Sequence, residues 1–447
     1  MSFSIRYNNK KPAIAWRGED TPMNMVSTLP PSAPPSGGVQ AKGGFQPGYI
    51  LAWAFCLLFY FLQYSVRSAP SVMMDELTAT MGLTTAGLGS LLGLYYYTYS
   101  ACSLISGASM DRWGAKLAIP VGTLVLAIGI AMFGAGPVWM AELGRLLQGA
   151  GAAFAFVGAV YLASHGFPAR YLATAIGVTQ CVGMLGGAMG QSTVAWLIHG
   201  IVTWRSFWVY AGVATAIVAV AIFLGTPRPE KSASGGQGSM LAPYRIVLGN
   251  PQSWLCGLCS GLLFLPTTVG SMTWGVSFMT HGWHMSYHEA VSRAAMVPIG
   301  WVFGCPILGY LADHLGRRKP VLFGGIVAML LSSAAIIYPP PGFFPPYILA
   351  FILGFASGAA MIPYSVIKEV NPDSVKGSAT GAINFLVFVM SAVASPLFGW
   401  FLQRLAGAGG LTETVFREGF SVGVAGIVLA GVVALFLRET GAAVRAG

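Results

Sequence analysis

Twelve apolar stretches of about 20 residues dominate the chain, and short polar loops separate them. An α-helix of about 20 apolar residues crosses the hydrocarbon core of a bilayer, where only helices and closed barrels are stable. Charged residues make up only 9% of the sequence, against about 25% in soluble domains. We therefore predict an all-α membrane protein with twelve transmembrane helices. The expected spans are 49–72, 85–108, 116–136, 139–164, 172–198, 205–225, 252–279, 291–311, 320–338, 346–367, 377–403 and 419–437.

Polar segments divide this chain into parts. Residues 1–45 are rich in Pro, Ser and Gly and contain no apolar run, which predicts a disordered cytoplasmic tail and not a signal peptide. Residues 226–250 form the longest internal polar segment and are predicted to be a cytoplasmic linker. This linker separates an N-terminal six-helix bundle, 46–225, from a C-terminal six-helix bundle, 251–437, and residues 438–447 form a second cytoplasmic tail.

The basic residues indicate how the chain lies in the membrane. With the N-terminus in the cytoplasm, most of the 24 Lys and Arg residues fall in cytoplasmic loops and tails. Such an excess is typical of the cytoplasmic side, so we predict a protein of the cytoplasmic (inner) membrane with both termini inside. Nucleic-acid-binding proteins cluster Lys and Arg on one exposed face, whereas here these residues are spread over short loops. We therefore expect the lipid bilayer and not nucleic acid as the partner. Nothing indicates an oligomer, and a monomer is expected.

Two groups of residues in the first bundle recur in the second. The spacing Gly-x3-Asp-x2-Gly follows the second span and, 202 residues later, the eighth. A proline, a glycine and an amide residue at the fifth span have equivalents 204 residues later, at the eleventh span. Two recurrences at nearly one offset indicate two pseudo-symmetric copies of one fold, with a solute site between them. The paired positions are Gly107, Asp111 and Gly114 with Gly309, Asp313 and Gly316, and Pro168, Gly177 and Gln180 with Pro372, Gly381 and Asn384.

The repeated loops resemble the G-x3-D-R-x-G-R/K motif of the major facilitator superfamily. The first copy reads Gly-Ala-Ser-Met-Asp-Arg-Trp-Gly-Ala-Lys over 107–116, and the second reads Gly-Tyr-Leu-Ala-Asp-His-Leu-Gly-Arg-Arg-Lys over 309–319. Residues 145–151, Arg-Leu-Leu-Gln-Gly-Ala-Gly, are similar to the family's R-x2-Q-G-x-G element. The resemblance covers 49–437. It implies a carrier that alternates between inward-open and outward-open states.

Both loops are interpreted as a conformational latch. Glycine lets two helices approach closely, and an aspartate at a helix end can pair with an arginine or with the N-terminus of another helix. Such contacts favour one state of a carrier over the other. Plain turn charge is the alternative, although it does not explain the second copy. The predicted latch residues are Gly107, Asp111, Arg112, Gly114, Gly309, Asp313, Gly316 and Arg317.

Arg67 in the first span is the strongest candidate for solute binding. An arginine at bilayer depth costs roughly 2.5–3.5 kcal/mol on insertion scales, so it needs a partner or water. Helical spacing places one polar stripe on this span, formed by Tyr60, Gln63, Tyr64, Arg67 and Ser71, and this stripe should face the central cavity. A guanidinium fork suits a carboxylate or phosphate. The position also resembles the first-helix arginine of organic-anion and organophosphate carriers of the family. The alternative is an arginine that snorkels to the outer interface. The matching residue of the second bundle is Ser271, which argues against a two-arginine phosphate clamp.

Other polar residues are expected to line the same cavity. Gln180 and Asn384 occupy equivalent places in the two bundles, and amides both donate and accept hydrogen bonds. Tyr96 and Tyr99 belong to a tyrosine-rich run in the second span, where buried hydroxyl groups need partners. The alternatives are hydrogen bonds between helices for the amides and simple packing for part of the tyrosine run.

A second intramembrane arginine suggests how proton movement is coupled to transport. Glu142 lies three residues before Arg145, a spacing that allows a salt bridge on one helix. Protonation of Glu142 would free Arg145, so the pair is a hypothetical proton sensor. A static pair that ties helices together is the alternative.

Catalytic, metal and cofactor sites are not expected. Cys256 and Cys259 form a CxxC without a second pair, for which buried packing is favoured over metal or redox chemistry. His281, His284 and His288 are interpreted as a solvated loop more than as a metal site or pH sensor. The sequence contains no nucleotide-binding loop or nucleophile motif, so an enzyme is not expected.

These patterns together predict a secondary active transporter. The favoured activity is proton-coupled import of a small organic anion of the carboxylate type. A carrier of larger or neutral cargo, such as a siderophore or a drug, is one alternative, and a non-transporting membrane receptor with the same fold is another. The identity of the solute, the direction and the coupling ion are not encoded in any pattern that we recognise.

Overall fold

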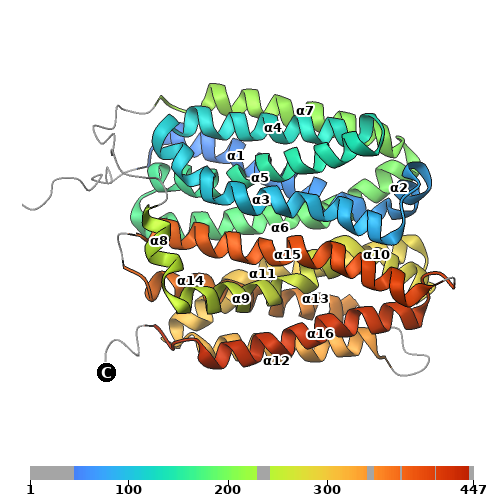
Figure 1. The fold of residues 1–447 in the computed structure, drawn as a ribbon. Helices are drawn as coiled ribbons and strands as arrows, with labels where there is room; N and C mark the ends of the chain where they lie inside the picture. Colours follow the sequence, from blue (N-terminus) through green and yellow to red (C-terminus); the bar gives the residue numbers. More distant parts are fainter. Residues whose placement is uncertain (1–44, 229–241, 340–346, 373–374, 408, 442–447) are drawn as a thin grey trace, which may run out of the picture. The chain divides into compact units, whose positions relative to one another are not determined.

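The computed structural model describes residues 45–228, 242–339, 347–372, 375–407 and 409–441, and Figure 1 shows their arrangement. Most of the predicted tail 1–45 and part of the linker 226–250 lie outside these ranges. The described residues form helices joined by short turns, without a strand. The prediction of an all-α fold is therefore confirmed.

The helices before the linker are called the N-half, and those after it the C-half. The N-half comprises α1 (Pro47–Ser68), η1 (Ala69–Val72), α2 (Met74–Met81), α3 (Thr85–Trp113), α4 (Ala115–Ala135), α5 (Val138–Gly166), α6 (Ala169–Gly200) and α7 (Trp204–Gly225). The linker contributes α8 (Ala242–Leu248). The C-half comprises α9 (Pro251–Leu265), η2 (Pro266–Trp274), α10 (Gly275–Ser277), η3 (Phe278–Gly282), α11 (Tyr287–His314), α12 (Lys319–Ile337), α13 (Tyr347–Ser357), η4 (Gly358–Met361), α14 (Ile362–Glu369), α15 (Lys376–Ala406) and α16 (Glu413–Phe436).

The predicted membrane spans match these helices in number and approximate position. Within the described ranges, 11 helices are long and apolar enough to cross a membrane, and a bent pair brings the number to 12. The bent pair joins α2 to α3 at an angle of 111°. The predicted second span lies within α3, whereas the short helix α2 before it was not predicted. We call the end of the bundle that carries α2 the α2 end, and the opposite end the loop-motif end.

The seventh span is not the regular helix expected over 252–279. It continues from α9 into two π-helical segments, η2 and η3. Pro266 begins η2 and has no N–H to donate, so the regular hydrogen-bond ladder is interrupted there. Threonine hydroxyls satisfy nearby carbonyls, because Thr268 Oγ1 donates to Phe264 O at 3.1 Å and Thr273 Oγ1 donates to Thr268 O at 2.8 Å.

Glycines let the two halves and their helices pack at short range. A Cβ on Gly89 of α3 would lie 3.0 Å from Gly399 Cα of α15, so these helices of the two halves meet backbone to backbone (Figure 1). Within each half, two helices also meet at a glycine, and the glycine and its contact occupy equivalent positions in the two halves. A Cβ on Gly149 would lie 2.0 Å from Tyr95 O, and one on Gly354 would lie 1.9 Å from Val297 O.

The halves are joined by hydrogen bonds at the α2 end. Gln191 of α6 donates through Nε2 to Ser71 Oγ at 3.2 Å and to Ser271 O of η2 at 2.9 Å. Tyr287 of α11 donates its hydroxyl to Val72 O at 2.5 Å. These bonds connect the N-half to the C-half just beyond the end of α1. The structure is therefore closed at the α2 end.

The loop-motif end repeats one set of contacts in both halves. Gly114 and Gly316 have φ values of 74° and 61°, a left-handed region that favours glycine. Lys116 Nζ donates to Phe223 O at 2.9 Å and to Thr226 O at 2.6 Å, at the end of α7. Its counterpart Lys319 donates to the carbonyls at the end of α16, at 2.9 Å and 3.1 Å. Each lysine therefore caps the C-terminus of the last helix of its half, where a positive charge is favourable.

Candidate functional site

Arg67 lies inside the helix bundle, enclosed by aromatic rings. Its exposed fraction is 3%, so it does not reach the lipid headgroups as the snorkelling alternative requires. Five rings surround the guanidinium carbon at 4.8–5.9 Å from their centroids. Desolvated cation–π contacts of this kind contribute about 2 kcal/mol or more. The rings, which we call the aromatic cage, are Tyr64, Tyr95, Tyr96, Tyr99 and Phe388.

The cage leaves the Arg67 charge without a protein counter-ion. Its Nε donates to the Tyr96 hydroxyl at 3.3 Å, while its Nη1 is buried and has no hydrogen-bond partner. Among the residues whose burial is described, no Asp or Glu is buried. A buried charge normally requires a partner. The guanidinium therefore presents an unused donor in a positively charged site.

Gln63 adds a second unused donor one helical turn before Arg67. Its Oε1 accepts a hydrogen bond from the Tyr95 hydroxyl at 2.7 Å, which fixes the amide. Its Nε2 is buried without a partner. Residues four apart lie on the same face of a helix, so both donors belong to the stripe that the sequence predicted on α1.

The two repeated amides are each held by a tyrosine. The Tyr60 hydroxyl donates to Gln180 Oε1 at 3.2 Å, and the Tyr364 hydroxyl donates to Asn384 Oδ1 at 2.9 Å. Asn384 Nδ2 also donates to Ser103 Oγ of α3 at 3.4 Å, so it bridges the two halves. Helix-to-helix hydrogen bonding, one alternative reading of these amides, therefore occurs in this structure.

Aromatic contacts connect both amides to the cage. The rings of Tyr60 and Tyr64 are 5.1 Å apart, and those of Tyr99 and Phe388 are 4.6 Å apart. The sequence prediction included Gln63, Tyr64, Tyr96 and Tyr99, and it placed Tyr60 on the polar stripe of α1. Tyr95, Tyr364 and Phe388 were not selected as binding residues. Tyr95 lies one turn before Tyr99, which was the available signal, while Phe388, one turn after Asn384, looks like ordinary core.

Arg145 is buried close to the cage but does not pair with Glu142. Its Nη1 donates to Gln148 Oε1 at 2.7 Å, and its Nη2 donates to Leu92 O at 3.4 Å. Glu142 is exposed, and no ion pair joins it to Arg145. The expected salt bridge is therefore absent from this structure, because Arg145 turns inward toward a competing amide. The Tyr95 ring lies between the two arginines, 5.7 Å from Arg67 and 5.0 Å from Arg145.

The second copy of the predicted latch forms an ion-pair network, with one correction. Arg318, and not the exposed Arg317, pairs with Asp313 and, at 2.8 Å, with Glu369 at the end of α14. The hydrogen bond to Glu369 raises the pKa of Arg318 above its ordinary value. Glu439 accepts the backbone N–H of Arg318 at 2.7 Å, at the N-terminus of α12.

Other latch positions are described only through their backbone. Gly107 and Gly309 lie within α3 and α11, where an added Cβ would meet no close backbone atom. The side chains of Asp111 and Arg112 lie outside the described structure. The contact expected of the first aspartate thus stays a prediction.

The cysteine and histidine clusters do not form a metal site in the described residues. Cys256 and Cys259 are buried and unbonded to each other. His281 Nε2 lies 3.8 Å from Asp75 Oδ1, while His284 and His288 are exposed.

Comparisons with known proteins agree with this architecture. A model of the Major Facilitator Superfamily matches residues 56–395 and 276–444. The chain is similar to the probable sulfoacetate transporter SauU of Cupriavidus necator, with 22% identity over 80% of this chain and 87% of that protein. It is similar to the cis,cis-muconate transport protein of Acinetobacter baylyi, with 24% identity over 87% and 95%.

Among solved structures, the fold is similar to that of a bacterial homologue of the lysosomal transporter Spinster. The TM-score is 0.69 at 18% identity, over 88% of this chain and 97% of that one. The relatives from Cupriavidus and Acinetobacter are named as transport proteins and not as enzymes, as the sequence predicts. Because the family model covers most of a multi-pass helical chain, this protein belongs to the Major Facilitator Superfamily.

Proposed function

We propose that this carrier imports a small organic anion together with protons, with Arg67 as the anion-binding residue. The observation that supports the proposal is the buried guanidinium, which has an unused Nη1 donor and no buried carboxylate among the described residues. An anionic solute would supply the missing counter-charge. The names of two relatives, transporters of sulfoacetate and of muconate, support the same class of solute.

The surroundings of Arg67 favour a small anion of the carboxylate type. A guanidinium binds such groups through parallel N–H bonds, and Gln63 Nε2 offers a further donor on the same face of α1. Gln180, Asn384, Tyr64, Tyr96 and Tyr99 would shape the rest of the pocket. The repeat counterpart Ser271 donates its hydroxyl to Ala294 O at 2.9 Å and carries no charge. One cationic contact suits a single carboxylate better than a phosphate that two arginines clamp.

The described closure supports an alternating-access cycle. With the α2 end sealed by Gln191 and Tyr287, exchange of solute in this state would occur at the loop-motif end. We propose that residues 46–225 and 251–437 rock as two bodies and that the loop-motif latch stabilises one of the two states. We further propose a monomer in the inner membrane with both termini in the cytoplasm, which follows from the distribution of basic residues.

Import of an anion requires energy from a coupled ion. Each negative charge that enters against an interior-negative potential of 100 mV costs about 2.3 kcal/mol. We propose the proton as the coupled ion. Glu142, which is exposed here, would reach Arg145 by rotating its side chain along α5 in the other state, and protonation would release it.

The coupling proposal is tested by comparing Glu142→Gln with Glu418→Gln, an exposed glutamate on α16. In proteoliposomes, Glu142→Gln should abolish the dependence of uptake on an imposed pH gradient, whereas Glu418→Gln should retain it. Unchanged proton dependence in Glu142→Gln would remove this residue from the coupling mechanism. The anion-binding proposal would stand on separate evidence.

The main test is a thermal-shift panel of short carboxylates and sulfonates on purified protein, repeated with Arg67→Gln. We expect one anion class to raise the unfolding temperature of the wild type and not that of the variant. Stabilisation that persists without Arg67, or by neutral solutes instead, would favour the alternative carrier of larger or neutral cargo. Ligand binding without flux in proteoliposomes would favour a receptor.

A further inference from the structure

A large apolar cavity lies within the C-half, apart from the aromatic cage. Its volume is about 470 Å³, and the segments η2, α11, α12, α13, α15 and α16 line it with apolar side chains almost throughout. None of the cage residues lines it. Interiors of proteins are normally packed without voids of this size. The cavity therefore calls for an occupant that is itself apolar.

The cavity opens toward the outside of the bundle between α15 and α16. Leu397, Trp400 and Val422 line it and are each more than half exposed, on helices that cross the membrane. Gly423 and Gly426 also line it, and an added Cβ on Gly423 would meet nothing within 4 Å. Small residues thus leave a lateral window, and the medium outside that window is lipid.

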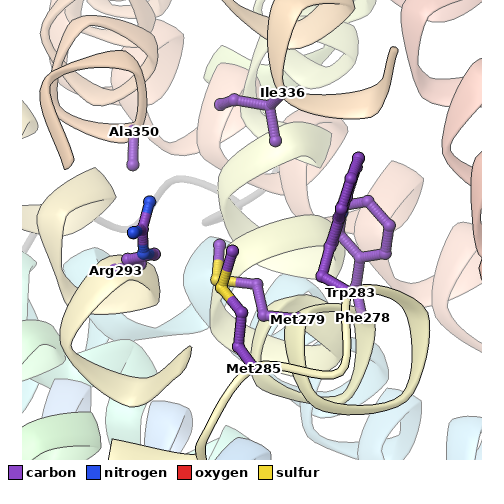
Figure 2. Close-up of a pocket in the computed structure, with 7 residues that line it drawn as sticks. All are labelled: Phe278, Met279, Trp283, Met285, Arg293, Ile336 and Ala350. Atoms are coloured by element: carbon purple, nitrogen blue, oxygen red, sulfur yellow. The ribbon is translucent and has the colours of Figure 1, made fainter. Parts of the chain in front are cut away.

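A basic residue stands at one end of this cavity. A small pocket of about 20 Å³ shares Phe278, Met279, Ile336 and Ala350 with the large cavity, and Arg293 lines it. Figure 2 shows Arg293 on one side of this pocket and Trp283 on the other. The apolar cavity therefore shares a wall with a small pocket that contains the ion-paired Arg293.

Arg293 has an unused donor like that of Arg67. The residue is 9% exposed, and its Nε and Nη2 bind Glu289 Oε1 at 3.2 Å and 2.7 Å. Its Nη1 is buried and has no hydrogen-bond partner. Its guanidinium carbon stacks 4.7 Å from the Tyr347 ring. The donor left over can bind one oxygen of an anion.

Arg293 lies near the start of α11, a helix long and apolar enough to cross a membrane. It lies six residues after Tyr287, the start of α11, which is about 9 Å along the helix axis. Arg417 of α16 pairs through Nη2 with Glu413, stacks 5.2 Å from the Trp283 ring and has a buried Nε without a partner. Tryptophan, tyrosine and arginine of this kind gather at membrane–water interfaces.

We propose that the C-half binds an anionic phospholipid of the surrounding bilayer at this site. One acyl chain enters through the window between α15 and α16 and fills the apolar cavity, and the phosphate receives the Nη1 donor of Arg293. Arg417, which is paired with Glu413, adds its unused Nε donor beside Trp283. The lipid would support the irregular segment η2–η3, whose packing otherwise borders a void. At the repeat offset of 202 residues, the counterpart of Arg293 in the N-half is Leu91, which carries no charge.

The test uses the purified full-length protein in a zwitterionic detergent. Dioleoyl phosphatidylglycerol and dioleoyl phosphatidylcholine, which share their acyl chains, are titrated while the unfolding temperature and lipid retention in native mass spectrometry are recorded. We expect the anionic lipid to stabilise the protein and to be retained about 10-fold better than the neutral one, as a charge-assisted contact predicts. Equal effects of the two lipids would overturn the proposal.

Three variants locate the site. Arg293→Gln should abolish the preference for the anionic lipid, and Arg404→Gln, an exposed arginine in the last turn of α15, should keep it. Gly423→Leu has space to be accommodated and should fill the cavity, so it should reduce retention of the lipid in a folded protein with Arg293 intact. Retention unchanged in both Arg293→Gln and Gly423→Leu would refute the site, as would equal stabilisation by inorganic phosphate alone.

Discussion

The two halves of this carrier have the same contacts at the loop-motif end but different residues in their interiors. At the loop-motif end, Lys116 and Lys319 cap the last helix of each half with the same pair of bonds, next to Gly114 and Gly316. In the interior, Arg67 of the N-half faces no counterpart, because Ser271 stands at its repeat position.

The difference separates residues that build the fold from residues that bind solute. Both halves must form and move, so the contacts that end their helices are duplicated. An organic anion has no two-fold symmetry, so a site that grips it does not need two equal sides. The N-half holds two buried guanidinium groups, those of Arg67 and Arg145, in and beside the cage. The C-half holds an apolar cavity with the buried Arg293 next to it.

The largest effect on uptake is expected when Arg67 of the N-half is replaced by serine, the residue at its repeat position in the C-half. Arg67→Ser should reduce uptake in proteoliposomes by about 100-fold or more, since a charge-assisted contact to the solute is lost. Adding Ser271→Arg should not restore it, because the tyrosines of the cage belong to α1 and α3 alone. Restored uptake in the double variant would show that the two interiors are interchangeable.

A smaller effect, on stability and on solute binding, is expected where a glycine of one helix packs against the backbone of another helix, at Gly149 in the N-half and at Gly354 in the C-half. Gly149→Ala and Gly354→Ala each force a Cβ against a carbonyl oxygen, of Tyr95 and Val297, and should each lower stability by about 1–3 kcal/mol. Only Gly149→Ala should also weaken binding of the solute, because Tyr95 holds Gln63 and contacts both buried arginines. Thermal unfolding measures the first effect and solute-induced stabilisation the second. Equal loss of binding in both variants would contradict the one-sided site.

The smallest effect is expected at the shared ends. Lys116→Ala and Lys319→Ala should each cost about 0.3–1 kcal/mol, as for a cation lost from a helix C-terminus, and should do so equally. Unfolding temperatures of the two variants at low ionic strength provide the measurement, with Arg404→Gln as a control for loss of an exposed charge. Unequal shifts in unfolding temperature would show that Lys116 and Lys319 stabilise their halves to different extents, although they form the same kind of bonds.

Much of the fold could be predicted from the sequence because lipid imposes a strong pattern. The spans, the repeat and the polar face of α1 all follow from apolar length and helical spacing. The bend between α2 and α3 and the π-helical η2 depend on local packing, which no periodicity reports. Cavities are a property of how side chains fit together, so the one in the C-half had no signal in the sequence.

The candidate site was only partly predictable for a similar reason. Spacing allows Glu142 to reach Arg145, but it equally allows Gln148, and burial selects the amide. Arg317 and Arg318 are neighbours in the sequence, and only the turn after Gly316 decides which one meets Asp313. Choices between near-equivalent partners require three-dimensional structure.

The bare positive charge of the aromatic cage has a kinetic consequence. Under the proposed function, a carrier that resets without cargo would move an unneutralised guanidinium through the occluded state, whereas the bound anion would neutralise it in the loaded form. The return of the unloaded carrier should then be the slowest step of the cycle, and its rate should depend on the membrane voltage. Solute on the far side would accelerate the turnover, so counterflow of labelled for unlabelled anion should outpace net accumulation.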